Sequence, residues 1–134
     1  MHVTGGCLCG AVRYEAQGEP MFAGLCHCRD CQRVSGSSHV AILGMPRAGF
    51  RATGEIRRFT VTGSSGHPTT RCSCPVCGST LFGEPGMAPD MIPIYVGGLD
   101  DLSLYRPEIS IYTRSRPPWG EMACTLEQFE GSDG

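Results

Sequence analysis

Eight of the nine cysteines in this chain lie in three tight clusters, and their spacing constrains the fold more than any other feature of the sequence. A C-x-C segment in extended conformation places both side chains on one face, and a C-x-x-C turn brings its two sulfurs together. A tetrahedral zinc ion, with Zn–S bonds of about 2.3 Å, requires thiolates at such short separations. The clusters therefore predict metal binding; they are Cys7-Leu8-Cys9, Cys26-His27-Cys28-Arg29-Asp30-Cys31 and Cys72-Ser73-Cys74-Pro75-Val76-Cys77.

The cellular compartment bears on whether these cysteines bind metal or form disulfides. The first residues contain no basic segment followed by an apolar run, so no signal peptide is visible. No stretch approaches the roughly 20 apolar residues that cross a bilayer. We therefore expect a cytoplasmic protein without a membrane segment, in which thiols stay reduced and bind metal. Nine is also an odd number, so a complete disulfide framework would leave one thiol unpaired.

Glycine and proline shape the expected fold. The chain has 134 residues, among them 19 glycines and 10 prolines, which favours short strands joined by many turns. We expect a mainly β fold of short antiparallel strands in one domain over residues 1–125, followed by a mobile tail over 126–134. We also expect Pro93 to mark an edge strand and Trp119 to pack a loop onto the sheet. Alternation and turn residues predict one helical turn at 29–35 and strands at 10–16, 20–26, 39–43, 50–53, 56–61, 69–73, 79–82, 91–96 and 108–112.

The net charge of the chain indicates which classes of partner it can bind. The formal net charge is −2 and the pI is near 6.0, so the chain lacks the basic surface that nucleic-acid binding requires. All eleven basic residues are arginine, a side chain that grips carboxylates in a bidentate fork. An acidic small molecule therefore remains compatible with the composition.

Counting the thiols divides them into two sites. A closed, structural zinc site takes four cysteines, which Cys7 and Cys9 supply together with the C-x-x-C pair Cys74 and Cys77. Three thiols then remain, from Cys26, Cys28 and Cys31, and leave a fourth coordination position open. Such an electron-rich site is a poor generator of hydroxide but suits a thiol ligand, which a metal holds as the thiolate.

A closed second site is the alternative. The three remaining thiols could be completed by Cys72 or His39, which would give two inert zinc ions. The sequence leaves this choice open.

The cysteine clusters and their surroundings resemble the glutathione-dependent formaldehyde-activating family, also called the centromere-protein-V-like family. The likeness covers nearly the whole chain. Weaker similarity extends through 97–101, 106–108 and 118–119. The three blocks that carry it are Gly6-Cys7-Leu8-Cys9-Gly10-Ala11-Val12-Arg13-Tyr14, the segment from Cys26 to Gly36, and Arg71 with Cys74-Pro75-Val76-Cys77-Gly78-Ser79-Thr80-Leu81-Phe82.

The resemblance implies a β-tent fold with two zinc ions per chain. It assigns Cys7, Cys9, Cys74 and Cys77 to a structural zinc, and Cys26, Cys28 and Cys31 to a catalytic one. The implied activity is that of a carbon–sulfur lyase, which joins glutathione and formaldehyde into S-hydroxymethylglutathione or reverses that step. This chain departs from the family pattern at Ser73, where phenylalanine is common, and at Ser110, where histidine is common.

Several other residues remain as candidates. Arg29 and Arg33 flank the three-thiol cluster and could meet the carboxylates of a glutathione-like ligand, or form a solvated basic turn. His27 lies between two ligands and should point away from their metal. Cys124 is expected to be a buried apolar thiol.

Two other functions compete with the lyase. The chain could be a binding module in which both zinc ions are structural, or a redox protein that uses surplus thiols such as Cys72. The oligomeric state is not predicted.

Overall fold

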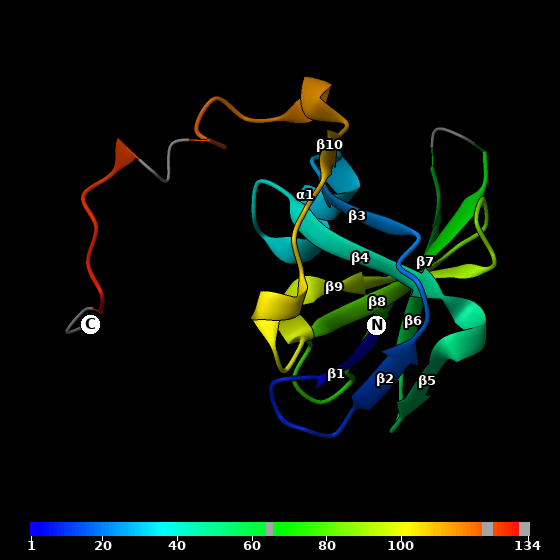
Figure 1. Ribbon diagram of the computed structural model, residues 1–134. Coiled ribbons are helices and arrows are strands. Elements are labelled where there is room, and N and C mark those ends of the chain that lie inside the picture. Colours follow the sequence, from blue (N-terminus) through cyan, green and yellow to red (C-terminus); the bar gives the residue numbers. More distant parts are fainter. Residues whose placement is uncertain (64–65, 122–124, 132–134) are drawn as a thin grey trace.

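The computed structural model describes residues 1–63, 66–121 and 125–131, which form two β-sheets and one short helix (Figure 1). The smaller sheet has the order β1-β2-β5 and is antiparallel throughout. Its strands are β1 (His2–Gly6), β2 (Arg13–Gln17) and β5 (Phe50–Thr53). The predicted mainly β fold is therefore confirmed.

The larger sheet has seven strands in the order β10-β3-β4-β9-β8-β7-β6. All its neighbours are antiparallel except β10 and β3, which run parallel and depart from the expected pattern. The strands are β3 (Phe22–Cys26), β4 (Val40–Pro46), β6 (Arg57–Thr62), β7 (Pro68–Ser73), β8 (Thr80–Pro85), β9 (Met91–Tyr95) and β10 (Ile109–Ile111). The helix α1 (Arg29–Ser35) follows β3, and the 3-10 turns are η1 (Arg47–Gly49), η2 (Val96–Gly98), η3 (Leu102–Leu104) and η4 (Thr113–Ser115).

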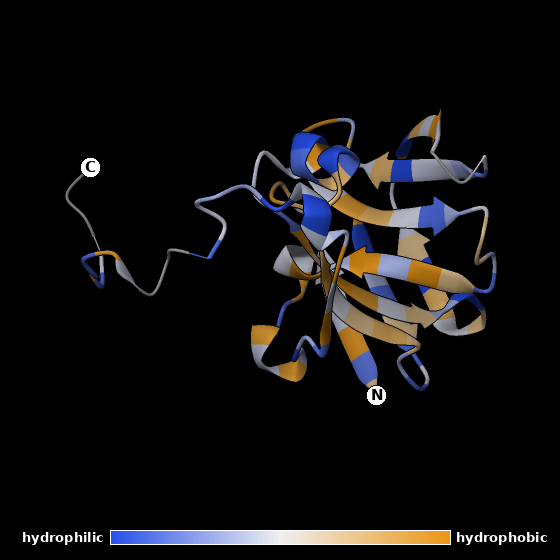
Figure 2. Ribbon diagram, turned by 90° about the horizontal axis from the view of Figure 1, so that it is seen from above, coloured by the Kyte–Doolittle hydropathy of each residue, from blue (hydrophilic) through white to orange (hydrophobic). Residues whose placement is uncertain are grey.

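The main core lies between the two sheets. Side chains from both sheets pack there, and hydrophobic residues are concentrated in this body of the molecule (Figure 2). Because alternate residues of a strand face opposite sides, β1, β2, β4 and β9 contribute every second side chain to this layer, among them Leu43 and Met45 of β4 and Ile92 and Ile94 of β9. Fully buried members include Val3, Val12, Leu43, Met45, Leu81, Ile92 and Ile94.

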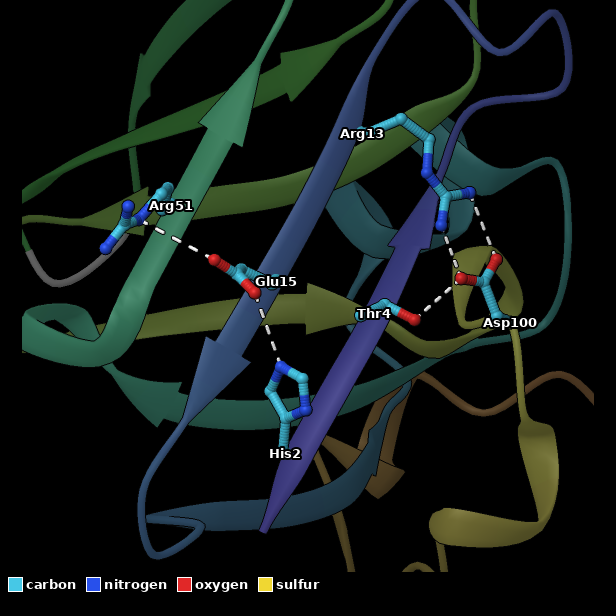
Figure 3. Close-up of polar contacts among 6 residues, drawn as sticks. All are labelled: His2, Thr4, Arg13, Glu15, Arg51 and Asp100. Carbon is cyan, nitrogen blue, oxygen red and sulfur yellow. Dashed lines mark hydrogen bonds and ion pairs between the residues drawn. The ribbon is translucent and has the colours of Figure 1, made fainter.

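Polar contacts hold the smaller sheet against the loop after η2 (Figure 3). The Arg13 guanidinium forms a bidentate ion pair with Asp100, in which the Nη1–Oδ1 distance is 3.1 Å. Asp100 also accepts a hydrogen bond of 2.7 Å from the Thr4 hydroxyl. These bonds raise the pKa of Arg13 and lower that of Asp100, so both groups stay charged. The pair thus fixes β1 and β2 beside η2.

The first strand was missed by the sequence analysis because its glycines weaken a strand signal. Gly5 is required by close packing, since a Cβ there would lie 2.4 Å from the Gly98 carbonyl oxygen and 2.4 Å from Tyr14 Oη. The strand pairs with β2 from His2 to Gly6. A sequence pattern based on side chains therefore could not show it.

The prediction that Pro93 marks an edge strand was wrong, because β9 lies between β4 and β8. The strand predicted at 39–43 also extends further, since β4 continues to Pro46. The register between β8 and β9 consists of one pair, Phe82 with Ile94. A residue without an N–H is tolerated there because few ladder bonds are made on that side.

The carboxy-terminal segment lies away from the sheets (Figure 1). Trp119 is 60% exposed, so the prediction that it packs a loop onto the sheet was wrong. The boundary at residue 125 stays a prediction, and residues 132–134 of the expected tail lie outside the described residues. Among the described residues, the helices are too short and polar to span a membrane.

Candidate metal centres

Four thiols from two distant segments meet at one point beside the smaller sheet. The sulfurs of Cys7, Cys9, Cys74 and Cys77 all lie within 4.8 Å of one another. The Cys7–Cys9 sulfur distance is 3.6 Å and the Cys9–Cys74 distance is 3.8 Å. Two ligands of a tetrahedral zinc are about 3.8 Å apart, given Zn–S bonds of about 2.3 Å. These distances fit a four-coordinate metal and are too long for a disulfide.

Two turns of similar design present these thiols. In the first, Val12 N–H donates to Cys7 Sγ at 3.2 Å, and in the second, Val76 N–H donates to Cys74 Sγ at 3.4 Å. Each turn contains a glycine with positive φ, namely Gly10 (82°) and Gly78 (77°), a conformation that other residues adopt at a cost. Burial opposes ionisation of Cys7, but the bond from Val12 N–H and those from Cys9 and Cys74 lower its pKa overall.

Ser79 connects the two turns and lowers the pKa of one ligand. Its hydroxyl accepts a hydrogen bond from Leu8 N–H at 3.0 Å and lies 3.2 Å from Cys77 Sγ. This side-chain contact and the Ser79 backbone lower the pKa of Cys77 to about 5. The thiol is therefore prepared for metal binding near neutral pH.

Three further thiols converge where β3 meets α1. The sulfurs of Cys26, Cys28 and Cys31 lie within 4.8 Å of one another, and in the described part of the chain no fourth cysteine, histidine or carboxylate joins them. Cys26 ends β3, while Cys28 is the N-cap of α1 and its Sγ accepts a bond of 3.3 Å from Cys31 N–H. We call this group the thiol triad.

Hydrogen bonds within the thiol triad favour ionisation of one member. Bonds from Cys26 and Cys31 lower the pKa of Cys28 to about 2. The same bonds raise the pKa of Cys26, because its thiol acts as donor. A divalent cation would ionise all three thiols, so the donor set suits a soft metal ion such as zinc.

A half-buried cation faces the thiol triad from β7. Arg71 Nη1 lies 3.6 Å from Cys31 Sγ and donates a hydrogen bond of 2.6 Å to Tyr95 Oη on β9. Burial alone would lower the pKa of Arg71, but Tyr95 and Cys31 outweigh it and raise the pKa. Arg71 therefore stays charged and offsets the negative charge of the thiolates.

Gly83 on β8 lies between Arg71 on β7 and Tyr95 on β9. Arg71 is in register with Gly83, and Tyr95 lies on the strand beyond it. A Cβ at Gly83 would lie 3.2 Å from Pro93 Cγ and 3.8 Å from Tyr95 Oη. The missing side chain thus opens space across β8.

A cavity of about 300 Å³ opens beside the thiol triad. All three cysteines line it together with Arg71 and Tyr95. A larger, open groove of about 690 Å³ runs past Cys7 and Val34 instead, and the triad does not line it. The smaller cavity is therefore the space in which a ligand would meet the triad.

Neither expected fourth ligand joins the thiol triad. Cys72 is fully buried and its Sγ lies 3.5 Å from Glu84 Oε1, and burial raises its pKa to about 12. His39 contacts Ser38 Oγ through Nδ1 at 2.9 Å. His27 is buried and packs against His39, with ring centroids 5.2 Å apart, so it points away from the triad sulfurs as expected.

The flanking arginines lie outside the cavity. Arg29 and Arg33 are exposed, and Arg29 donates a hydrogen bond to Gln32 Oε1. Ser110 on β10 also does not line the cavity, whereas its neighbours Ile111 and Tyr112 do. Cys124 lies outside the described residues.

Sequence reasoning missed the role of two residues. Arg71 was noted as part of a motif without a role, and Tyr95 was not singled out. A lone arginine in a strand beside a buried cysteine is the signal that could have drawn attention to Arg71. Tyr95 carries no such signal, because an aromatic residue in an apolar strand ordinarily indicates packing.

Comparisons with known proteins agree with this architecture. The family described as "Glutathione-dependent formaldehyde-activating enzyme" matches residues 2–115. A crystal structure of a Rhodobacter sphaeroides protein superposes with a TM-score of 0.61 at 18% identity, covering 80% of this chain and 98% of that one. Comparison with curated proteins gives no match.

Proposed function

The chain belongs to the glutathione-dependent formaldehyde-activating family, and we propose on this basis that it is a zinc-dependent carbon–sulfur lyase acting on a thiol and a small aldehyde. The observation that carries the proposal is the thiol triad, whose three sulfurs face a cavity rather than a fourth ligand among the described residues. Open coordination is typical of catalytic zinc, and four cysteines are typical of structural zinc. Cys26, Cys28 and Cys31 accordingly hold the catalytic ion, and Cys7, Cys9, Cys74 and Cys77 the structural one.

A zinc ion held by the thiol triad would bind the substrate thiol and keep it in the thiolate form. The residues of the chain supply the rest. The three cysteines place that sulfur at the end of the cavity, and Arg71 offsets part of the charge that accumulates there. The apolar walls exclude water, which keeps the thiolate poorly solvated and reactive.

The chemical step conserves atoms and electrons without a further reactant. The thiol releases its proton to solvent when it ionises. The thiolate sulfur then bonds to the carbonyl carbon, the C=O π pair moves to oxygen, and that oxygen takes up the equivalent proton from solvent. In reverse, the hydroxyl proton leaves, the C–S bond breaks and the free aldehyde departs. No oxidant or reductant is needed.

Metal content gives the first test. Native mass spectrometry should find two zinc ions per chain. The variant Cys28→Ser should retain one zinc and a cooperative thermal transition, because the four-cysteine site is intact. A protein with two zinc ions whose Cys28→Ser variant fails to fold would favour the structural binding module instead.

Exchange spectroscopy gives the second test. With ¹³C-formaldehyde and a thiol present, the purified protein should accelerate exchange between free aldehyde and hemithioacetal in NMR spectra. The Cys28→Ser variant should match the uncatalysed rate. Equal rates with and without the wild-type protein, for every thiol and aldehyde tried, would refute the lyase.

A further inference from the structure

The walls of the cavity at the thiol triad are mostly apolar. They come from β3, α1, β4, β7, β8, the turn after β8, β9 and β10, which surround a volume of about 300 Å³. A substrate held by its sulfur at the triad would direct the rest of its body against these walls. The apolar side chains are Phe22, Ile42, Met87, Met91, Pro93 and Ile111.

Charge is scarce in the same cavity. Among the described lining residues, Arg71 and Asp30 are the charged side chains apart from the cysteines. The Arg71 charge is shared with the triad, because its Nη1 lies 3.6 Å from Cys31 Sγ, beside its bond to Tyr95 Oη. Three thiolates, a divalent cation, Arg71 and Asp30 together carry a net charge of −1. The cavity therefore offers no surplus positive charge to an anionic substrate.

Glutathione does not match this lining. Near neutral pH it carries two carboxylates and one ammonium group, and its carboxylates need cationic partners when they leave water. Arg29 and Arg33 would be the nearest candidates by sequence, but both are exposed and neither lines the cavity. Asp30 on the lining would repel a carboxylate further.

We propose that the thiol substrate of this site is a small apolar thiol, aliphatic or aromatic and without carboxylates, rather than glutathione. The inference rests on the proposed function and changes its substrate class, while the carbon–sulfur bond forms and breaks as described above. The methionines suit such a ligand, because their flexible thioethers adapt to ligands of varied shape.

Thiol binding to the cobalt-substituted protein tests the proposal without relying on turnover. Cobalt at the thiol triad should change its visible absorption when a thiol binds, and a titration then gives the dissociation constant. From ethanethiol to butanethiol, affinity should rise about fourfold per methylene, as expected for burial of apolar surface. Glutathione should bind at least tenfold more weakly than butanethiol.

A variant with a positive charge at the mouth of the cavity tests whether glutathione lacks a cationic partner there. Met87 is 67% exposed, so Met87→Arg should be tolerated. It should tighten glutathione binding several-fold relative to ethanethiol binding, whereas the neutral control Met87→Gln should not improve glutathione relative to ethanethiol. Unchanged glutathione affinity in Met87→Arg would contradict the proposed lack of a cationic partner.

The outcomes separate this inference from the proposed function. Glutathione binding more tightly than butanethiol, or affinity independent of alkyl length, would overturn the substrate class and leave the lyase intact. Absence of any spectral response to every thiol would overturn the lyase itself, and the substrate class with it.

Discussion

Arg71 on β7 donates a hydrogen bond of 2.6 Å to the hydroxyl of Tyr95 on β9, across the intervening strand β8. The same Arg71 nitrogen lies 3.6 Å from Cys31 Sγ. The phenol therefore holds the guanidinium in place beside the thiol triad. The cation of Arg71 is thus positioned by a residue of β9 and lies at a site built by β3 and α1.

The first prediction concerns this cation. Arg71→Met should keep the apolar part of the side chain but remove the charge, and it should weaken metal binding at the triad about 10- to 100-fold, as is usual when a partner of metal ligands is lost. Competition with a chromophoric chelator measures this affinity. Tyr95→Phe, which keeps the charge, should have a smaller effect. Equal metal affinity in wild type and Arg71→Met would contradict the role of Arg71.

Gly83 gives a second prediction, on access to the cavity. Gly83→Val should place side-chain atoms between Pro93 and Tyr95, where a Cβ alone already lies 3.2 Å from Pro93 Cγ. We expect two metal ions per chain but loss of the cobalt response to thiols. Gly83→Ala, with a smaller intrusion, should reduce thiol affinity less. A valine variant that binds thiols normally would show that this space is not used.

The four-cysteine site gives a third prediction, on stability. Because metal binding couples to folding, Cys77→Ser or removal of both zinc ions by a chelator should lower the melting temperature strongly. Cys28→Ser, which leaves this site intact, serves as the matched control. The measurement is thermal unfolding followed by circular dichroism. Similar melting temperatures for Cys77→Ser and Cys28→Ser would argue against distinct roles for the two centres.

Gln32 gives a fourth prediction, on the loop that carries the triad. Its buried side-chain amide donates bonds of 2.9 Å to the carbonyl oxygens of His27 and Ser115, and so ties the triad loop to η4. Gln32→Leu should lower the free energy of unfolding by about 1–3 kcal/mol, because these carbonyls lose their donors. Chemical denaturation measures the loss. Gln32→Glu, which lacks the amide donors, should be destabilised as well.

Glu84 gives a fifth prediction, on pH. Burial would raise the pKa of this carboxylate, but Arg58 at 2.9 Å, together with Cys72 and Arg47, lowers it overall. Since the pKa is lower in the folded state, the stabilisation is complete above the unfolded pKa of about 4.3 and is lost as the pH falls through the folded value.

Thermal unfolding between about pH 6 and pH 3 tests whether the stabilisation by Glu84 is lost as the pH falls. Wild type should lose more stability than Glu84→Gln over this range, so their melting temperatures should converge toward acid. Glu55→Gln, at an exposed glutamate, is the control for the general effect of removing a carboxylate. A constant difference between wild type and Glu84→Gln at all pH values would contradict the prediction.

The local pattern of the sequence predicted the two groups of thiols, because metal sites leave short, rigid spacings. The grouping of Cys7 and Cys9 with Cys74 and Cys77 follows from ligand number alone, and their sulfurs do lie together. Most strand positions were also predicted, since turn residues mark their ends. β1 was the exception, because its glycines are chosen by close packing against Tyr14 and Gly98 rather than by strand propensity.

Contacts across the sheet could not be predicted from local pattern. The position of β9 inside the sheet depends on its sparse pairing with β8, which no property of Pro93 itself indicates. The meeting of Arg71, Tyr95 and Cys31 likewise depends on strand order and on the missing side chain at Gly83. The exposed position of Trp119 shows that composition near a terminus does not decide packing.

The four-cysteine centre joins residues that the ribosome makes at different times, since Cys9 and Cys74 are 65 positions apart. While the intervening chain is still being translated, the first turn holds half of a ligand set. Capture of the ion must therefore wait until the second turn has left the exit tunnel. Under the proposed assignment of zinc to this site, newly made chains in a cell starved of zinc would keep unprotected thiols, and the supply of the ion would limit how much folded protein is formed.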